Sequence, residues 1–374
     1  MNIVLVGMMG SGKSTVGKLL AEQMGIPLID TDKEIEKISG KTVSEIFEVD
    51  GEAKFRRMER EMVEIATATG EVVIATGGGA LLDLGNLEIL RGNGILIHLK
   101  CSAQELQRRL AKNPGRPLLD GKNTPGEIER LLAERVQKYG ESDLEVDADK
   151  APEVVAAEII SKLQIRGKVV AVMAEKTMQE MCETIRKAAN MKPDLVELRL
   201  DSLNNIGEGE ISSLIGECIK AGIPAIVTCR IDNRIRKMQI MKIALDCGAV
   251  LVDADGELEG LPVERAIASH HDFKGTPELR VLKKIAMVLE DASVVKIACK
   301  TETPADERSL LELLEWGIGS GRKISVNSMG NGGKRWRIVS AILGSELIYC
   351  HLGKPNAEGQ IALEEIMRLK RIWK

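Results

Sequence analysis

The sequence predicts two consecutive α/β domains, a three-layer P-loop domain with a parallel sheet over residues 1–165 and a (β/α)8 TIM barrel over residues 166–374. Apolar runs of strand length alternate with amphipathic segments of helix length, which is typical of parallel sheets covered by helices. A glycine-rich phosphate-binding pattern follows the first run, and from residue 169 onward the alternation repeats eight times. Eight such repeats indicate a barrel.

The composition fits ordinary globular domains and excludes several classes of function. Charged residues make up 29% of the 374 residues and hydrophobic ones 44%, and the net charge is −4. This balance gives no support for a nucleic-acid partner. Aromatic residues make up only 2%, so we expect an aliphatic core and no base-stacking platform.

The seven cysteines are irregularly spaced and form no Cys-x-x-Cys pair, which favours a reduced, cytoplasmic chain. A strand and the glycine-rich loop begin at once, so we expect no signal peptide. No apolar run approaches the length of a membrane span, so no membrane partner is expected. A homodimer is one assembly that the sequence allows.

The phosphate-binding pattern Gly-x4-Gly-Lys-Ser occupies Gly7–Ser14, between the first strand and the first helix. Glycines let successive N–H groups point at a phosphate, and the helix start adds its partial positive charge. Lys13 can reach the β and γ phosphates, and Ser14 can ligate magnesium. A chance glycine-rich turn is the alternative. The nucleotide-binding residues predicted here are Gly10, Ser11, Gly12, Lys13, Ser14 and Thr15.

The rest of the first domain supplies candidate substrate contacts. Strand-like runs cover 2–6, 26–29, 72–76 and 95–99, and helix-like segments cover 13–24, 31–39, 42–49, 52–69, 102–112, 125–139 and 151–163. Asp30 and Asp32 follow the second strand, where α/β sheets bind ligands. One can serve magnesium and the other can accept a proton from a hydroxyl, unless one of them only caps the next helix.

Arg56 and Glu59 share a helix face, and a paired guanidinium offers a planar fork for a carboxylate, with a solvated salt bridge as the alternative. The run Gly77-Gly78-Gly79 ends a strand and lets a ligand contact bare backbone, unless it is a plain turn. Residues 113–121 form a Pro/Gly-rich loop whose Arg116 indicates a lid over the phosphates. These features indicate a kinase for a small anionic, hydroxylated substrate, with a gluconate-type or nucleotide kinase as the rival.

In order and context, these motifs, together with Arg135-x-x-x-Tyr139, resemble those of shikimate kinase over residues 1 to about 165. The resemblance implies phosphorylation of the 3-hydroxyl of shikimate by ATP with Mg²⁺, with Lys13 and Arg116 on the phosphates. It implies that Asp32 holds and deprotonates the substrate hydroxyl. The other implied contacts are Arg56 and Arg135 to the carboxylate, Gly78 and Gly79 to ring hydroxyls, Ser14 and Asp30 to magnesium, and Arg108 near the adenine.

The second domain has strand-like runs at 169–174, 195–200, 224–229, 249–254, 265–271, 293–299, 323–328 and 346–351, and helix-like segments at 177–190, 208–221, 235–247, 276–289, 304–316, 334–343 and 359–371. Only about ten residues, 255–264, separate the fourth and fifth strands. A parallel crossover usually needs a dozen or more, so we expect the fourth helix to be missing or reduced to a turn.

Lys296 interrupts an apolar strand, and burial favours a neutral amine that can attack a carbonyl. A structural lysine paired with Glu197 is the alternative, and Lys300 at the rim is the competitor. His271 is the natural proton carrier, with Glu197 to orient it, unless it is a core histidine. Further candidates at the carboxyl ends of strands or just beyond them are Arg199, Arg230, Met329, Arg337 and Gln360.

The stretches that carry these residues resemble type I 3-dehydroquinate dehydratase; they are 196–199, 228–230, 269–273, 295–298, 328–330 and 359–360. The resemblance implies a Schiff base between Lys296 and 3-dehydroquinate, no cofactor, and proton transfer by His271. It also implies a carboxylate contact by Arg337 and polar contacts by Arg199, Arg230 and Gln360. The family commonly has Glu-Gly-Gly after the strand-three arginine, where this chain has Ile231–Ile235, and Ser or Thr at the position of Asn356, a further predicted substrate contact.

The whole chain is therefore interpreted as a bifunctional enzyme of the shikimate pathway. A P-loop kinase of another hydroxy acid fused to a Schiff-base aldolase is the alternative within enzymes. A P-loop regulatory module that gates one surviving enzyme is the alternative outside them, and the full set of kinase motifs argues against it.

Overall fold

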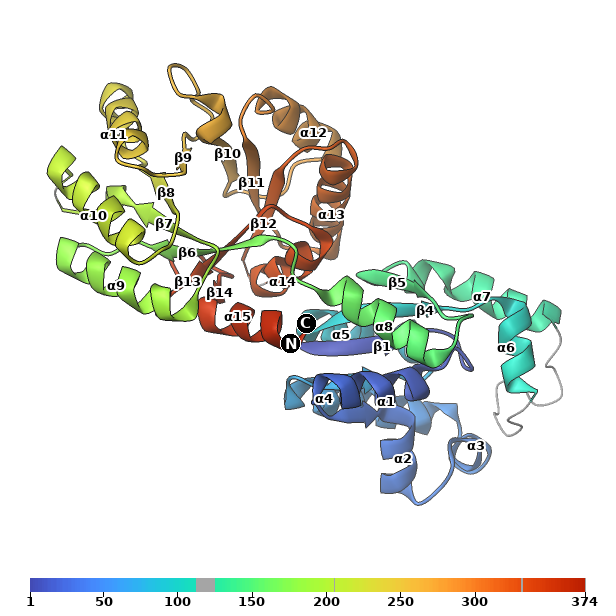
Figure 1. Ribbon diagram of the computed structural model, residues 1–374. Coiled ribbons are helices and arrows are strands. Elements are labelled where there is room, and N and C mark those ends of the chain that lie inside the picture. Colours follow the sequence, from blue (N-terminus) through green and yellow to red (C-terminus); the bar gives the residue numbers. More distant parts are fainter. Residues whose placement is uncertain (112–124, 205, 331, 374) are drawn as a thin grey trace. The chain divides into compact units, whose positions relative to one another are not determined.

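The computed structural model describes residues 1–111, 125–204, 206–330 and 332–373. The chain divides into two compact units, Met1–Leu163 with Ile372–Lys374, and Gln164–Arg371. Each unit is built on one parallel sheet (Figure 1). The predicted lid with Arg116 lies outside the described residues. No helix in the described parts of the chain combines the length and apolar character that a membrane crossing requires.

The first unit has a sheet of strand order β2-β3-β1-β4-β5 between helices on both faces. The strands are β1 (Asn2–Val6), β2 (Leu28–Asp30), β3 (Val73–Ala75), β4 (Gly94–Lys100) and β5 (Leu144–Asp147). The helices are α1 (Lys13–Met24), α2 (Thr31–Ser39), α3 (Val43–Glu45), η1 (Ile46–Asp50), α4 (Glu52–Thr69), η2 (Ala80–Leu82), α5 (Leu84–Asn93), α6 (Ala103–Leu110), α7 (Pro125–Tyr139) and α8 (Pro152–Leu163). Helices α1 and α8 pack together, and residues of α4, α5 and α7 bury the other face of the sheet.

A strand, an α-helix and the short 3-10 helix η2 of this unit were not predicted, and one further helix was predicted differently. Strand β5 carries charges on alternate positions because it is an edge strand, and its Glu145 reaches Lys100 Nζ at 2.8 Å. Helix α5 contains poor helix formers, but Asp83 caps it by accepting the N–H groups of Gly85 and Asn86. The helix expected over 42–49 is a short α3 followed by the π-helix η1.

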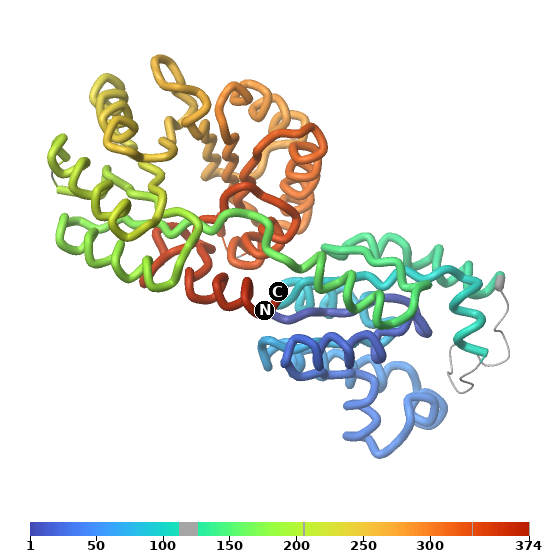
Figure 2. Tube along the Cα trace, in the orientation of Figure 1, coloured from blue at the N-terminus to red at the C-terminus, as the bar shows by residue number. Residues whose placement is uncertain are grey.

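The second unit is a barrel-like parallel sheet with the order β12-β11-β10-β9-β8-β7-β6-β13-β14. The strands are β6 (Lys168–Met173), β7 (Leu195–Arg199), β8 (Ala225–Thr228), β9 (Leu251–Asp253), β10 (Ala266–Asp272), β11 (Val294–Lys300), β12 (Ile324–Met329), β13 (Leu347–His351) and β14 (Ile361–Ala362). The helices are α9 (Met178–Met191), η4 (Leu200–Ser202), α10 (Glu208–Lys220), α11 (Arg234–Asp246), η5 (Val263–Arg265), α12 (Leu279–Val288), α13 (Pro304–Gly319), α14 (Gly333–Leu343) and α15 (Leu363–Ile372). Figure 2 traces these alternating strands and helices around the unit.

Strands β12 and β13, at the two sides of the seam, are joined by serine side chains as well as by main chain. The Leu347 N–H donates to Ser325 Oγ at 2.8 Å, and the Val326 N–H donates to Ser345 Oγ at 3.3 Å. The Glu346 N–H donates to the Ile324 carbonyl at 2.9 Å. These bonds satisfy the backbone groups at the seam, which would otherwise be buried without partners.

The fourth crossover has no α-helix, as expected, and contains only the 3-10 turn η5. Two ion pairs tie this crossover to the preceding helix α11. Lys237 Nζ lies 2.7 Å from Glu257 Oε2, and Arg234 Nη2 lies 2.7 Å from Glu259 Oε2. The side chain of Leu258 packs against the core that is shared with α12. The crossover therefore covers part of this core with Leu258, without an α-helix.

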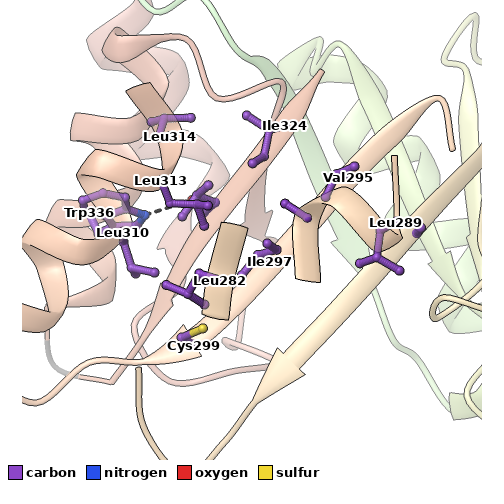
Figure 3. Close-up of a cluster of buried hydrophobic side chains, with 13 residues drawn as sticks. Leu282, Leu289, Val295, Ile297, Cys299, Leu310, Leu313, Leu314, Ile324 and Trp336 are labelled. Carbon is purple, nitrogen blue, oxygen red and sulfur yellow. Dashed lines mark hydrogen bonds between the residues drawn. The ribbon is translucent and has the colours of Figure 1, made fainter. Parts of the chain in front are cut away.

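Alternate residues of each barrel strand face two different cores, as the period of two requires. Outward residues of β10–β12 pack against α12, α13 and α14 around Trp336, whose indole N–H donates to the Val326 carbonyl at 2.9 Å (Figure 3). Inward residues form an apolar plug, and they are Val170, Val172, Leu195, Ile226, Ile267, Val294, Leu347 and Tyr349. By this parity, Lys296, two residues beyond Val294, points into the barrel.

Candidate active sites

The glycine-rich loop of the first unit joins β1 to α1 and is held closed by its own lysine. Lys13 Nζ donates to the carbonyls of Gly7 at 2.8 Å and Met8 at 3.0 Å. Gly10 and Gly12 have φ values of 83° and 97°, a conformation that side chains disfavour. The loop thus turns tightly into the start of α1, where the free N–H groups of a helix can receive an anion.

A cavity of about 510 Å³ opens beside this loop and fits a nucleotide. Lys13, Ser14, Thr15 and Arg108 line it, together with Arg109, which the sequence analysis missed. Arg109 donates to the Ser11 carbonyl at 3.2 Å and to the Ala148 carbonyl at 2.7 Å, so it fixes the loop from outside. In the sequence, Arg108 and Arg109 are adjacent at the end of a short helix. This pattern did not show which of the two contacts the glycine-rich loop.

A second cavity of about 490 Å³ lies on the other side of Asp32. Both cavities include Ser14, Asp30, Asp32 and Gly78 in their walls. A hydroxylated ligand in the second cavity would therefore meet a phosphate in the first at this shared wall. Remaining residues of the second wall include Phe47, Phe55, Arg56, Glu59, Gly77 and Gly79.

The two aspartates after β2 are in different situations. Asp30 caps α2, because its Oδ1 accepts the Lys33 N–H at 3.3 Å. Its other oxygen, Oδ2, is buried and has no hydrogen-bond partner among the described residues. Asp30 thus caps the helix, which was the alternative considered for it, and still offers one oxygen to a cation. Asp32 lies two residues further, in the first turn of α2, on the wall that the two cavities share.

The three glycines after β3 are each required by a close approach. A Cβ on Gly77 would lie 2.7 Å from Asp32 Oδ1, and one on Gly78 would lie 2.9 Å from the Met9 backbone nitrogen. A Cβ on Gly79 would lie 2.9 Å from an Nη atom of Arg56. Any side chain here would displace the aspartate, the phosphate loop or the arginine.

The two predicted carboxylate clamps are placed differently. Arg56 forms ion pairs with Glu59 at 2.8 Å and Glu52 at 3.0 Å and lines the second cavity. Burial raises the pKa of Glu59, and the Arg56 guanidinium opposes this rise. Arg135 is buried and donates to the Gly78 carbonyl at 2.9 Å. In the described structure Arg135 thus supports the glycine turn rather than lining the cavity.

The barrel contains a buried polar layer above its apolar plug, centred on Lys296. Lys296 Nζ lies 2.9 Å from Asp253 Oδ2, 3.9 Å from Glu197 Oε1 and 4.0 Å from the centroid of the Tyr349 ring. Glu197, which the alternative of a structural lysine pairs with Lys296, is thus the more distant of the two carboxylates. Lys300 lies at the rim, 42% exposed, and pairs with Glu302.

Asp253 was not predicted as a site residue, although its position on β9 shares parity with the inward Leu251. Its Oδ1 accepts the Ser269 hydroxyl at 2.7 Å. Burial opposes the charged form, but the Lys296 ammonium and the Ser269 hydroxyl outweigh it and hold the pKa of Asp253 below its usual range. A fully buried ion pair therefore lies at the centre of the barrel.

His271 ends β10 and faces the same layer. Its Nε2 accepts a hydrogen bond from Arg230 Nη2 at 2.8 Å. Burial lowers the pKa of His271 to about 3, and the positive charges of Lys296 and Arg230 add to this effect. Glu197, predicted to orient this imidazole, instead accepts the Thr228 hydroxyl at 2.7 Å. His271 is thus neutral near pH 7, as a general base requires.

The remaining predicted contacts surround this layer. Arg199 makes a bidentate pair with Asp201, at 3.0 and 2.6 Å. Arg337 is buried, and its Nη1 donates to the carbonyls of Ser328 at 3.2 Å and Gly333 at 3.0 Å. Burial lowers the pKa of Arg337 to about 10, and its Nε lacks a hydrogen-bond partner among the described residues. A buried guanidinium whose Nε–H has no hydrogen-bond acceptor among the described residues can receive an anion there.

The loop between β13 and β14 is held by hydrogen bonds among its own residues. Gln360 Oε1 accepts the N–H groups of Asn356 at 2.7 Å and Ala357 at 3.3 Å. Arg337 also donates to the Gly359 carbonyl, which ties this loop to α14. Met329 ends β12 opposite Lys300 of β11. The substrate contacts predicted for Gln360, Asn356 and Met329 therefore remain predictions.

Comparison with known proteins assigns each unit. A family model described as shikimate kinase matches residues 9–164, and one described as type I 3-dehydroquinase matches residues 169–373. A shikimate kinase of Caldicellulosiruptor bescii is 45% identical over 43% of this chain and 94% of its own length. One of Symbiobacterium thermophilum is 46% identical over 45% of this chain and 98% of its own. The chain belongs to both families.

The protein is thus a bifunctional enzyme of the shikimate pathway, with a transferase unit, the kinase, and a lyase unit, the dehydratase. The solved structure of 3-dehydroquinate dehydratase from Geobacillus kaustophilus is similar to the second unit, with a TM-score of 0.50 and 19% identity over 55% of this chain and 90% of that chain. This likeness shows the barrel fold of the dehydratase unit.

Proposed function

We propose that the kinase unit transfers the γ-phosphoryl group of ATP to the 3-hydroxyl of shikimate. The observation that carries this proposal is the wall that the two cavities share. Asp32 on that wall accepts the proton of the attacking hydroxyl, and Lys13 and the N–H groups of the loop hold the phosphates. Arg56 and Arg135 bind the substrate carboxylate, Gly78 and Gly79 its hydroxyls, and Arg108 and Arg116 the nucleotide.

The residues present fit a magnesium ion bound together with the nucleotide. Asp30 Oδ2 is buried without a hydrogen-bond partner among the described residues, and Asp30 and Ser14 line both cavities. Oxygen ligands of this kind suit magnesium, and the phosphates and water complete its shell. Among the described residues, no three His, Cys, Asp or Glu side chains form a metal site of their own. When bound, the ion neutralises developing charge on the phosphates.

In the dehydratase unit, Lys296 attacks the ketone of 3-dehydroquinate, and the resulting carbinolamine loses the former carbonyl oxygen as water to form an iminium. The attacking amine must first lose a proton, and Asp253 at 2.9 Å is the acceptor within reach. His271 then removes the proton next to the iminium carbon and returns a proton to the departing hydroxyl. Water hydrolyses the product imine and frees 3-dehydroshikimate and Lys296. The substrate contacts proposed here are Glu197, Arg199, Arg230, Met329, Arg337, Asn356 and Gln360.

Several broader expectations accompany these reactions. The functional domains span 1–165 and 166–374, and the protein works in the cytoplasm, where its seven free cysteines stay reduced. Separate expression of the two segments tests the boundaries, because each should fold and keep its own activity. Light scattering of the full chain tests for a homodimer.

Incubation of the full chain with each substrate separately tests the proposed reactions. Shikimate should be phosphorylated only with ATP and magnesium, whereas 3-dehydroquinate should be dehydrated in EDTA. Borohydride added during dehydration should fix substrate mass on Lys296 by reducing the imine. A Lys296→Ala protein that still traps substrate would rule out the assignment, and an EDTA-sensitive dehydration would contradict the metal-free imine.

A further inference from the structure

The shortened fourth crossover carries a carboxylate that none of these roles uses, that of Asp255. Its Oδ1 lies 3.8 Å from Nδ1 of His271. It also lies 3.2 Å from the Ser269 hydroxyl, which stands between Asp255 and the Lys296 partner Asp253. Asp255 therefore faces the imidazole on one side and, on the other, adjoins the Ser269 hydroxyl that donates to Asp253 of the buried ion pair.

The backbone holds Asp255 in this position. Its φ of 54° lies in the left-handed region, where aspartate is tolerated better than most residues. The Asp255 N–H donates to Asp253 Oδ1 at 3.2 Å, and the Glu257 N–H donates to the Ala254 carbonyl at 2.9 Å. Glu257 is in turn paired with Lys237 of α11. The turn that aims Asp255 at His271 is thus fixed at both of its ends.

The hydrogen bond from Arg230 determines which ring nitrogen of His271 carries the proton. Arg230 can only donate, so Nε2 of His271, at 2.8 Å, is the acceptor. A neutral imidazole then carries its proton on Nδ1, the atom that faces Asp255. A carboxylate on that side orients the ring and stabilises the imidazolium that forms when Nε2 takes a proton.

We propose that Asp255 is the positioning residue of His271 in the dehydration, in the place expected for Glu197. The proposal rests on the proposed role of His271 as the proton carrier. Glu197 is engaged with Thr228 and lies near Lys296. Asp255 can face His271 because the fourth helix is absent. A tight turn, rather than the start of a helix, follows β9.

Titration of His271 reports on this role. The charged and titratable groups that act on it are Lys296 of β11, Arg230 after β8, Asp253 of β9, His270 of its own strand and Asp255 of the crossover. Because a carboxylate stabilises the imidazolium, loss of the Asp255 charge should lower the pKa of His271 further. The chain has only four histidines, so the His271 signal can be assigned by NMR.

The test compares Asp255→Asn and Asp255→Gly in the full chain. Asparagine keeps the size and the backbone preference, and glycine keeps the turn without any side chain. For both we expect kcat for dehydration to fall by about 10- to 100-fold, with KM changed less than about threefold. The acid limb of kcat/KM should move to lower pH, and borohydride trapping on Lys296 should stay at the wild-type extent. Glu259→Gln, on the same crossover, is the matched control and should keep full kcat.

Wild-type kcat and an unchanged His271 titration in both variants would overturn the proposal. If His271→Ala still abolishes dehydration in that case, the proposed reaction stands and only the role of Asp255 falls. If His271→Ala also keeps activity, the role of His271 itself is wrong. A Glu197→Gln variant that shifts the His271 titration while Asp255→Asn does not would assign the orienting role to Glu197.

Discussion

Replacing Asp253 with asparagine removes the charge that faces Lys296 at the centre of the barrel. The two groups are 2.9 Å apart, and their side chains are 1% and 7% exposed. Asparagine keeps the size and can still accept the Ser269 hydroxyl. The substitution therefore isolates the charge of the buried pair.

The expected loss of stability follows from this geometry. Removing one partner of a buried ion pair costs about 3–5 kcal/mol because the other charge is left uncompensated. Glu197 at 3.9 Å and the Tyr349 ring at 4.0 Å still face Lys296 and reduce that cost. We therefore expect the barrel to lose about 2–3 kcal/mol of unfolding free energy at pH 7.

The effect should depend on pH in one direction. The pKa of Asp253 is depressed in the folded protein, so its stabilisation is fully present above the unfolded value of about 3.9. It is lost as the pH falls through the lower folded value. The difference between wild type and variant should thus be constant from pH 5 to 7 and shrink in stronger acid.

Tryptophan fluorescence during urea unfolding measures this difference in the full chain. Two of the three tryptophans, Trp316 and Trp336, lie in the barrel and report on its unfolding, whereas Trp373 belongs to the first unit. The matched control is Glu302→Gln, which breaks the exposed pair with Lys300 of β11 and should cost less than about 1 kcal/mol. Equal losses in the two variants would refute the claim that the buried pair stabilises the barrel.

Three further results are expected. Gly78→Ala should abolish shikimate phosphorylation and leave dehydration unchanged, because its Cβ would lie 2.9 Å from the Met9 nitrogen; unchanged phosphorylation would remove the reason given for this glycine. Arg337→Met removes a charge-assisted contact, so steady-state kinetics should show KM for 3-dehydroquinate raised by about 100-fold, with a smaller change in kcat. An unaltered KM would exclude the role of Arg337 in binding the carboxylate. Because the pKa of His271 is lowered to about 3, kcat/KM for dehydration should show no imidazole limb near pH 6.5; a fall through that pH would show that His271 titrates normally.

Periodicity predicted most elements of the fold, because buried parallel strands and amphipathic helices leave clear patterns. Periodicity did not predict elements that are stabilised by an ion pair or a helix cap rather than by a buried apolar face. Strand β5 is an edge strand whose Glu145 pairs with Lys100, so its sequence lacks an apolar run. Helix α5 relies on the Asp83 cap rather than on helix propensity. The missing fourth helix was predictable because a short connection limits what the chain can form.

The site was predictable where one motif supplies the residues and less so where separate strands meet. The loop at Gly7–Ser14 is local in sequence, and its geometry follows from its glycines. By contrast, the partner of Lys296 lies 43 residues away on another strand. Parity along a strand does not distinguish Glu197 of β7 from Asp253 of β9, and the sequence analysis named only Glu197. The distances to Lys296 Nζ in the folded protein, 3.9 Å from Glu197 and 2.9 Å from Asp253, show that Asp253 lies closer.

Parallel activity assays of two single variants test the central claim, that one chain carries two independent sites. Asp32→Ala should abolish ATP-dependent shikimate phosphorylation and keep wild-type dehydration of 3-dehydroquinate. Lys296→Ala should do the reverse. Loss of both activities in either folded variant would contradict two independent sites, and retention of the targeted activity would contradict the residue assignment.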